Sequence, residues 1–335
     1  MSPEAQAPGA ASSGVASSNA TELVGRRVSV EAPGTIANLG AGYDCLGLAI
    51  ELPLRVSVEA RALEGGPDVE LTIEGDCVGE LPEDRSNRFV VALEAGLAEL
   101  GFSGVDRVGW TIHMSNPIPL ERGLGSSAAA TVAGLVAAGA LAGHELDTGP
   151  LLRIATGIEG HPDNVAPALL GGLVASVALE GGVESVRLEP PRNLLVVAWI
   201  PERKLPTSEM RRVLPDSVPR ADAISNLARV AVGVAGLASG RLDVLRLLTD
   251  DRLHEPYRAA VYPELPVLVA AARDAGALGA CLAGAGSTIV AFVDGADESA
   301  ADRVGAAFRT TAARLGQPGR LTALAARADG ASVTT

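Results

Sequence analysis

The chain has 335 residues, of which 47% are hydrophobic, and a formal net charge of −13 at pH 7. This length exceeds what one hydrophobic core usually organises, so two domains are expected. The negative charge argues against nucleic acid or an anionic membrane as the main partner. The longest apolar stretch, residues 128–143, is shorter than a membrane span and predicts a buried helix.

The three cysteines, Cys45, Cys77 and Cys281, are far apart and show no C-x-x-C spacing, which is typical of a reducing cytoplasm. Residues 1–24 are mostly Ala, Ser, Pro and Gly, with neither a basic start nor an apolar block. We therefore expect a disordered tail there and no signal peptide.

Three segments alternate polar and apolar residues and predict half-buried strands of an antiparallel sheet. They are residues 27–32, 55–60 and 69–74. The connection between the first two, residues 32–47, contains four glycines and the polar residues Asn38 and Asp44 among apolar neighbours. Residue types alone favour a loop in which these two side chains bond the local backbone.

A helix is predicted over residues 86–100, with Gly101 ending it, and a strand over 108–114. The next segment, residues 117–134, reads P-I-P-L-E-R-G-L-G-S-S-A-A-A-T-V-A-G. The prolines and glycines of its first half predict a loop. From Ser126 the residues favour a helix, and a serine at the junction can cap its first turn. A helix N-terminus after a glycine-rich loop is a ready site for phosphate.

Three interpretations of this loop compete. A P-loop requires Lys before the Ser/Thr, but Gly125 precedes Ser126 and the only lysine is Lys204. A dinucleotide fingerprint is also unsuitable, because a proline-containing loop separates the glycines from the preceding strand and the acidic Glu145 follows a helix. The third interpretation is structural, a small-residue helix start against which another element packs closely.

A second helix, predicted over residues 151–158, runs into E-G-H-P-D-N-V-A-P-A-L-L-G-G, which begins at Glu159. Its polar residues include His161, Asp163 and Asn164, which would be costly to bury so close together unless they were paired. A solvated turn is the simple interpretation, and apolar runs on both sides favour a turn placed against a core.

The composition changes after the predicted strand 194–200, so the domains are expected to span residues 25–190 and 191–330. Two arginine segments follow, T-S-E-M-R-R-V-L-P from Thr207 and H-E-P-Y-R ending at Arg258. Ion-paired surface arginines are the local interpretation of both. The segment A-G-A-G-S, residues 283–287, predicts a turn before a strand.

Several of these segments resemble one superfamily, that of galactokinase, homoserine kinase, mevalonate kinase and phosphomevalonate kinase (GHMP kinases). P-x-x-x-G-L-G-S-S-A-A-A from Pro119 resembles its phosphate loop. P-G-T-I-A-N-L-G-A-G-Y-D-C-L-G-L-A from Pro33 and the segment from Glu159 resemble motifs of homoserine kinases in particular. The arginine segments resemble substrate motifs of that family, and residues 283–287 resemble the third superfamily motif, with Ala283 and Ser287 replacing its serine and proline.

The resemblance implies an α+β, two-domain GHMP kinase fold, with an N-terminal domain like domain 2 of ribosomal protein S5 and a ferredoxin-like C-terminal domain. It implies an ATP-dependent phosphotransferase that uses Mg²⁺ and phosphorylates the hydroxyl of L-homoserine in threonine biosynthesis. A homodimer is expected from the family alone. The alternatives are another small-molecule kinase of the superfamily, of mevalonate or shikimate type, and a member that binds ligand without catalysis.

The resemblance also implies roles for individual residues. The nucleotide-binding residues would be Asn87, Pro119, Leu120, Glu121, Arg122, Gly123, Leu124, Gly125, Ser126, Ser127, Ala128 and Ala129. The substrate-binding residues would be Asn38, Asp44, His161, Asp163, Thr207, Arg211, Arg258 and Gly284. The catalytic residues would be Ser127, Glu159 and Asn164, with Mg²⁺ held by Ser127 and Glu159 because a hard cation takes oxygen ligands.

Within these roles, Arg211 and Arg258 are expected to hold the α-carboxylate of homoserine through paired hydrogen bonds. Acidic and amide oxygens, including those of Asp44, would accept from its α-amino group. Asn164 stands where mevalonate kinase carries aspartate, which predicts catalysis by positioning and charge stabilisation without a side-chain general base. The Glu159 assignment assumes a deletion, because some relatives have several more residues between this Glu and His161.

Overall fold

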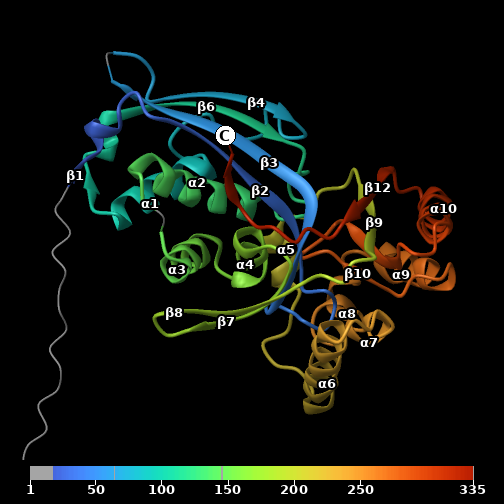
Figure 1. Ribbon diagram of the computed structural model, residues 1–335. Helices are drawn as coiled ribbons and strands as arrows, with labels where there is room; N and C mark the ends of the chain where they lie inside the picture. The colour runs from blue at the N-terminus through green and yellow to red at the C-terminus, as the bar shows by residue number, and fades with distance from the viewer. Residues whose placement is uncertain (1–17, 64, 145, 335) are drawn as a thin grey trace, which may run out of the picture.

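The computed structural model describes residues 18–63, 65–144 and 146–334. Two large β-sheets, each with its own helices, form its two halves (Figure 1). The strands of the larger sheet are β2 (Arg27–Ala37), β3 (Leu46–Ala62), β4 (Val69–Gly75), β6 (Val108–Asn116), β7 (Leu173–Leu179), β8 (Gly182–Leu188) and β13 (Ser332–Thr334). Their order is β13-β2-β3-β6-β4, and β7 pairs with both β3 and β8.

The expected antiparallel sheet is present with one exception, since β4 runs parallel to β6. The helices of this half are α1 (Arg88–Glu99), α2 (Ser126–Ala142), α3 (Thr148–Glu159) and α4 (Pro162–Leu170). They lie between the β2–β3 part of the sheet and the β7–β8 hairpin (Figure 1). The end of α3 and the start of α4 therefore lie beside the N-terminus of α2.

The smaller sheet contains β9 (Leu194–Pro201), β10 (Gly279–Leu282), β11 (Ile289–Asp294) and β12 (Gly319–Ala325). Its order, β10-β11-β9-β12, is antiparallel throughout, and α9 (Glu264–Asp274) and α10 (Ala300–Arg314) pack on it. The succession β9-α9-β10-β11-α10-β12 is the ferredoxin-like arrangement. The predicted two-domain α+β fold is thus confirmed.

Four further helices, three of them short, connect β9 to α9. They are α5 (Thr207–Arg212), α6 (Arg220–Ala238), α7 (Leu245–Leu248) and α8 (Glu255–Arg258). Among the described helices, α6 alone has the length and apolar composition of a membrane span, a weak indication because helices of soluble proteins also have them. The switch from the larger to the smaller sheet falls between β8 and β9, and β13 returns the chain to the larger sheet, where it pairs with β2.

Two sequence expectations require correction here. The disordered tail was expected to reach residue 24, but β1 (Ser18–Asn19) pairs with β5 (Phe102–Ser103), and the 3₁₀ turn η1 (Ala20–Leu23) follows it. Asn19 and Glu22 form a capping box, and Ala20 and Leu23 are buried, so this part is ordered. Another 3₁₀ turn, η2 (Val105–Arg107), follows β5, and residues 1–17 lie outside the described residues.

The glycine-rich connection is also shorter than expected, because β2 extends to Ala37 and β3 begins at Leu46. The alternation of polar and apolar residues stops at Pro33, where the β2–β3 register shifts. Beyond that shift both strands are almost wholly buried, so their residues no longer alternate. The true loop is residues 38–45, and it carries Asn38 and Asp44.

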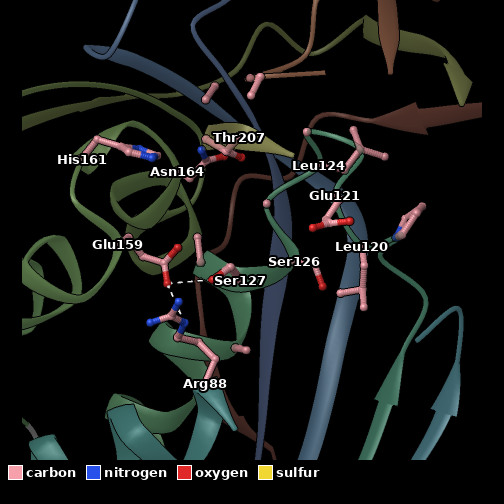
Figure 2. A pocket seen from close by; sticks show the side chains of 18 of the residues that line it. Arg88, Leu120, Glu121, Leu124, Ser126, Ser127, Glu159, His161, Asn164 and Thr207 are labelled. Atoms are coloured by element: carbon pink, nitrogen blue, oxygen red, sulfur yellow. Dashed lines mark hydrogen bonds and ion pairs between the residues drawn. The ribbon is translucent and has the colours of Figure 1, made fainter. Parts of the chain in front are cut away.

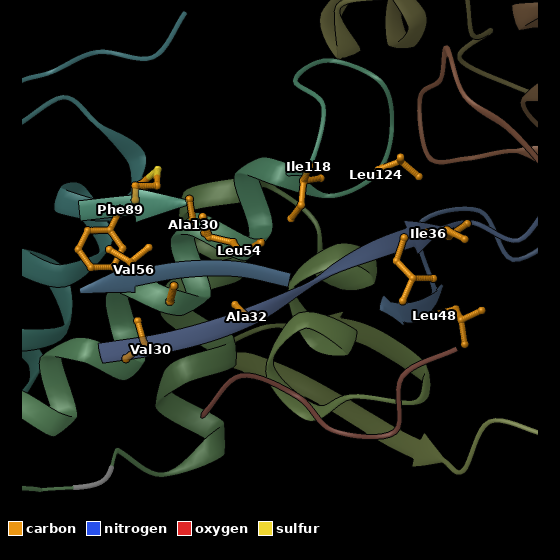
Figure 3. Packing of buried hydrophobic residues seen from close by; sticks show 14 of the residues in the cluster. Val30, Ala32, Ile36, Leu48, Leu54, Val56, Phe89, Ile118, Leu124 and Ala130 are labelled. Atoms are coloured by element: carbon orange, nitrogen blue, oxygen red, sulfur yellow. The ribbon is translucent and has the colours of Figure 1, made fainter. Parts of the chain in front are cut away.

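The main core fixes the position of α2. Val30 of β2 and Leu54 and Val56 of β3 share one buried cluster with Phe89 of α1 and Ala130 of α2 (Figure 3). Because small residues dominate α2, it can approach the sheet and α1 closely. This packing holds the N-terminus of α2 at the boundary between the two halves.

Candidate functional site

A cavity of about 590 Å³ lies between the two halves of the molecule. The N-termini of α1, α2 and α4, the loop 38–45 and the end of α3 line it from one half, and α5, α8 and Gly284 line it from the other. Every site residue proposed from the sequence lines this cavity except Arg122 and Ala129. Segments far apart in the sequence therefore meet at one place.

Arg122 and Ala129 are the two exceptions for different reasons. The Arg122 guanidinium turns toward the smaller sheet, where it donates to the backbone carbonyls of Pro201 (2.8 Å) and Glu202 (2.6 Å). Ala129 is fully buried in the main core. Arg122 therefore joins the two halves and Ala129 packs α2 against the sheet.

The first turn of α2 is open to a ligand. Its N-cap is Gly125, with φ of 76°, and no side chain bonds the cap. The expected serine cap is wrong, because the Ser126 hydroxyl instead accepts a hydrogen bond from Asn116 Nδ2 at 3.0 Å. A helix start without a side-chain cap keeps N–H groups that favour an anion.

The packing of the protein requires glycine at positions 123 and 125 of the loop, independently of any ligand. A Cβ on Gly125 would lie 2.0 Å from Thr35 Oγ1, and one on Gly123 would lie 2.0 Å from the Ala283 carbonyl oxygen. Both glycines have positive φ. The structural and the phosphate-binding interpretations of the loop are therefore compatible, and a larger residue at Gly125 would disturb packing as well as any ligand.

An oxygen-rich cluster lies beside this helix start (Figure 2). Glu159 is the last residue of α3, and its Oε1 accepts from Ser127 Oγ at 2.8 Å and from Thr131 Oγ1 at 2.7 Å. Ser127 and Thr131 are one turn apart on α2, so both face the carboxylate. Such oxygens suit Mg²⁺. Within the described residues no group of three or more His, Cys, Asp or Glu side chains could hold a metal, so a cation here would need oxygens from a nucleotide as well.

Two residues at the start of α1 complete this end of the cavity. Asn87 caps the helix by accepting from the Phe89 N–H at 3.0 Å, and its amide donates to the Pro82 carbonyl at 2.8 Å. Arg88 follows it, with Nε 3.5 Å from Glu159 Oε1 (Figure 2). Arg88 and Thr131 were not predicted from the sequence, although the spacing of Thr131 from Ser127 on one helix was an available signal.

The other end of the cavity is built around Arg211. Its two terminal nitrogens donate to the two carboxylate oxygens of Asp44 at 3.0 and 2.8 Å, and one of them also donates to the Tyr43 hydroxyl at 3.0 Å. Burial lowers the pKa of Arg211, but the hydrogen bond and charge of Asp44 outweigh it, so this pKa is raised. The pair is a charged fork at the edge of the cavity.

Arg258 is almost fully buried beside this pair. Its Nη1 donates to the Gly284 carbonyl at 2.8 Å and to His254 Nδ1 at 2.9 Å. Burial lowers the pKa of His254 to about 4, so the ring is neutral near pH 7. Nδ1 then accepts from Arg258, and Nε2–H donates to the Gly40 carbonyl at 2.9 Å. His254, which also stacks on Tyr43, holds Arg258 against the loop 38–45.

Both polar atoms of the Asn38 side-chain amide form hydrogen bonds within the protein. Its Nδ2 donates to the Gly284 carbonyl at 2.9 Å, and its Oδ1 accepts from the Asp44 N–H at 3.0 Å. The residue also has a positive φ of 73°. These contacts fix the position of Asp44 and tie the loop to the smaller sheet.

The segment after Glu159 packs against the core, and a solvated turn is wrong for it. Asp163 is 2% exposed and its Oδ1 lies 2.5 Å from His161 Nδ1. Burial lowers the pKa of His161, but the bond and charge of Asp163 outweigh it and raise this pKa. The next residue, Asn164, accepts from the buried Thr35 hydroxyl at 2.8 Å, a partner that the sequence analysis missed.

Known proteins resemble this chain in sequence and in fold. The model of the GHMP kinases N-terminal domain matches residues 87–172, and that of the GHMP kinases C-terminal domain matches residues 234–313. The chain is 42% identical to the homoserine kinase of Moorella thermoacetica, with 83% of this chain and 92% of the relative covered. It is 40% identical to that of Thermus thermophilus, with 83% and 90% covered.

The crystal structure of homoserine kinase from Cytophaga hutchinsonii aligns with a TM-score of 0.81 at 29% identity, covering 92% of this chain and 97% of that one. The chain belongs to the homoserine kinase family of the GHMP kinases.

Proposed function

We propose that this protein is a homoserine kinase that transfers the terminal phosphoryl group of ATP to the hydroxyl of L-homoserine. One observation carries the proposal: a single cavity joins a helix N-terminus and an oxygen cluster at one end to a charged fork at the other. A kinase that acts on an amino-acid alcohol needs both ends at once. The similarity to homoserine kinases over most of the chain supports the same function.

The fork suits a zwitterion. Arg211 and Asp44 neutralise each other in the structure, so this pair offers one positive and one negative group. An α-carboxylate can pair with the guanidinium while an α-ammonium group pairs with the carboxylate, and the exchange leaves no charge unpaired. Mevalonate and shikimate each carry a carboxylate but no ammonium group. They would leave Asp44 without a partner, which disfavours both.

We propose ATP and Mg²⁺ as the cofactors. Ser127 and Glu159 would hold the metal with the nucleotide, because their oxygens already lie 2.8 Å apart next to the open helix start. Bound there, Mg²⁺ would neutralise phosphate charge and stabilise the charge that develops on the transferred group. The N–H groups at the start of α2 would bind phosphate oxygens directly.

The protein's own contribution to the reaction is then mainly positioning. The substrate hydroxyl oxygen attacks the terminal phosphorus, the bond to the bridging oxygen breaks, and ADP leaves. Thr35 fixes the amide of Asn164, and Asp163 is engaged with His161, so neither residue is arranged as an unengaged base. The hydroxyl proton would pass to the transferred group or to solvent.

The protein would act in the cytoplasm, where its three cysteines, free in the structure, would stay reduced. The family suggests a homodimer. L-homoserine is the only partner that the chemistry of the cavity requires besides the cofactors.

The function can be tested by measuring ADP release from ATP and Mg²⁺ with L-homoserine, mevalonate, shikimate or no acceptor. We expect release to depend on L-homoserine. Release stimulated only by mevalonate or shikimate would replace the proposed substrate. Nucleotide binding with no release for any acceptor would indicate a ligand-binding member of the fold without catalysis.

Arg211→Lys is expected to raise KM for L-homoserine by about 10- to 100-fold, because one ammonium group cannot copy two parallel charged hydrogen bonds. KM for ATP should change little, since Arg211 lies at the opposite end of the cavity from Ser127. Steady-state kinetics with each substrate varied in turn measure both constants. Equal effects on both KM values would instead indicate that the Arg211–Asp44 pair only holds the two halves of the protein together.

A further inference from the structure

Arg88 forms an ion pair with Glu159 and has no role in the reaction proposed above. Its Nε lies 3.5 Å from Glu159 Oε1, the same oxygen that accepts from Ser127 and Thr131 (Figure 2). The Arg88 side chain is 47% exposed and lines the cavity. In the described part of the chain its other guanidinium nitrogens have no hydrogen-bond partner, so they can bind a ligand.

The other cationic side chains that line the cavity are already committed elsewhere. Arg211 is paired with Asp44, and Lys204 with Glu80. Arg258 is buried among carbonyl groups and His254. His161 is bound to Asp163. Among the described residues that line the cavity, Arg88 is therefore the one strong cation beside Ser127 and the start of α2.

A phosphoryl group in transfer carries negative charge that P-loop kinases meet partly with a lysine of the loop. The loop of residues 117–134 has no lysine, and its Arg122 turns away toward Pro201 and Glu202. A guanidinium can bind two phosphate oxygens at once. Arg88 is placed to supply this charge from the start of α1.

We propose that Arg88 exchanges partners during the reaction, which rests on the proposed function. In the empty site it neutralises Glu159. When the nucleotide binds, Arg88 leaves this carboxylate and contacts the terminal phosphate, which carries more charge and accepts paired hydrogen bonds. The exchange also leaves Glu159 available to the cation that accompanies the nucleotide. Arg88 is then a catalytic residue that stabilises the charge of the transferred phosphoryl group.

An exposed ion pair that serves only the fold would be worth little, usually below about 1 kcal/mol. The Arg153–Glu99 pair is such a case and offers a matched control. Arg153 lies on α3, is 46% exposed and contacts Glu99 at 2.6 Å, and neither residue lines the cavity. The two pairs should therefore respond differently when the arginine is removed.

The experiment compares Arg88→Met, Arg88→Lys and Arg153→Met with the unmodified chain. Calorimetry measures the binding of a non-hydrolysable ATP analogue and of ADP, each with Mg²⁺ and without acceptor. We expect Arg88→Met to weaken the ATP analogue about 10-fold or more and ADP much less, as loss of a charged hydrogen bond to the terminal phosphate predicts. Arg88→Lys should recover part of the loss, and Arg153→Met should bind both nucleotides normally.

Kinetics and thermal unfolding complete the test. Arg88→Met should lower kcat at saturating ATP and L-homoserine at least about 10-fold with a nearly unchanged Tm. Equal weakening of the ATP analogue and ADP, or normal binding and kcat, would overturn the inference. Because nucleotide binding is measured without acceptor, a failure of L-homoserine as the substrate would leave the Arg88 result interpretable.

Discussion

Glu159→Gln is expected to lower kcat/KM for ATP by at least about 10²-fold without unfolding the protein. The substitution keeps the size of the side chain and an oxygen that can accept from Ser127 and Thr131. It removes the negative charge that suits this cluster to a divalent cation. Removing one preorganised electrostatic group from an active site commonly costs about 10²- to 10³-fold.

Two further variants make this result specific. Thr131→Val removes one hydrogen bond to Glu159. It should raise the Mg²⁺ concentration needed for half-maximal activity about 10- to 100-fold, because the loss of a group that supports a metal ligand usually weakens metal binding by that factor. Glu99→Gln removes a carboxylate from an ion pair outside the cavity and should leave kinetics unchanged. Normal kcat/KM in folded Glu159→Gln would show that the cluster is structural and that the metal carboxylate lies elsewhere.

The sequence predicted the parts of the site that belong to contiguous motifs. Ser127 and Glu159 were assigned to one metal site although 32 positions separate them, and their side chains meet at 2.8 Å. The motif carried this information, because residue types and spacing alone left a solvated turn as the simple interpretation. The two-domain α+β fold was predicted by the same resemblance and is confirmed by the two large sheets.

Contacts between distant segments could not be predicted in this way. Thr35 fills the space beside Gly125 and donates a hydrogen bond to Asn164. A threonine in a predicted strand gives no indication of a hydrogen-bond partner 129 positions away. His254 fixes Arg258 through its neutral ring, and its burial is visible only after folding. The resemblance assigned Arg122 to the nucleotide-binding residues but carried no information on the direction of its side chain, which turns away from the cavity.

Local patterns also failed where both faces of a strand are buried. Alternation stopped at Pro33, so the second half of β2 and the first residues of β3 looked like a long loop. Strands of this kind have no polar face that would reveal their period. The ordered turn at residues 20–23 was missed because four residues are too few to show a helical period, and only its contact with the core reveals it.

Glu255→Gln is expected to stabilise the protein already at pH 6.5 and to stabilise it by about 2 kcal/mol more at pH 8.5. Glu255 is three residues before Arg258 on α8, and its Oε1 accepts from the Leu282 N–H at 2.7 Å. Burial raises the pKa of this carboxyl to about 8, against about 4.5 in an unfolded chain. Folded protein therefore keeps the proton that unfolded protein has lost, and stability falls as pH rises toward 8.

The groups around Glu255 define the useful pH window. Burial lowers the pKa of His254 to about 4, whereas an unfolded histidine has a pKa of about 6.5. Below about pH 6.5 the unfolded chain therefore binds a proton that the folded protein does not, and His254 lowers the stability only there. Burial raises the pKa of Cys281 well above its usual value, and it stays neutral here. Burial raises the pKa of Asp251, but hydrogen bonds from Asn226 and from backbone N–H groups outweigh burial and lower it, so Asp251 stays ionised. Arg273 and Arg258 oppose the shift of Glu255 only in part.

Between pH 6.5 and 8, Glu255 is therefore the group of this cluster whose charge differs between the folded and the unfolded protein, and 1.5 pH units correspond to about 2 kcal/mol of unfolding free energy. Part of the Glu255 surface reaches solvent, so this value is an upper limit. Urea unfolding at pH 6.5, 7.5 and 8.5 measures the slope, with exposed Glu180→Gln as the control. Glu255→Gln should flatten the slope that Glu180→Gln retains. A uniform loss of stability at all three pH values would mean that the carboxyl is ionised in the folded protein and that α8 depends on its charge.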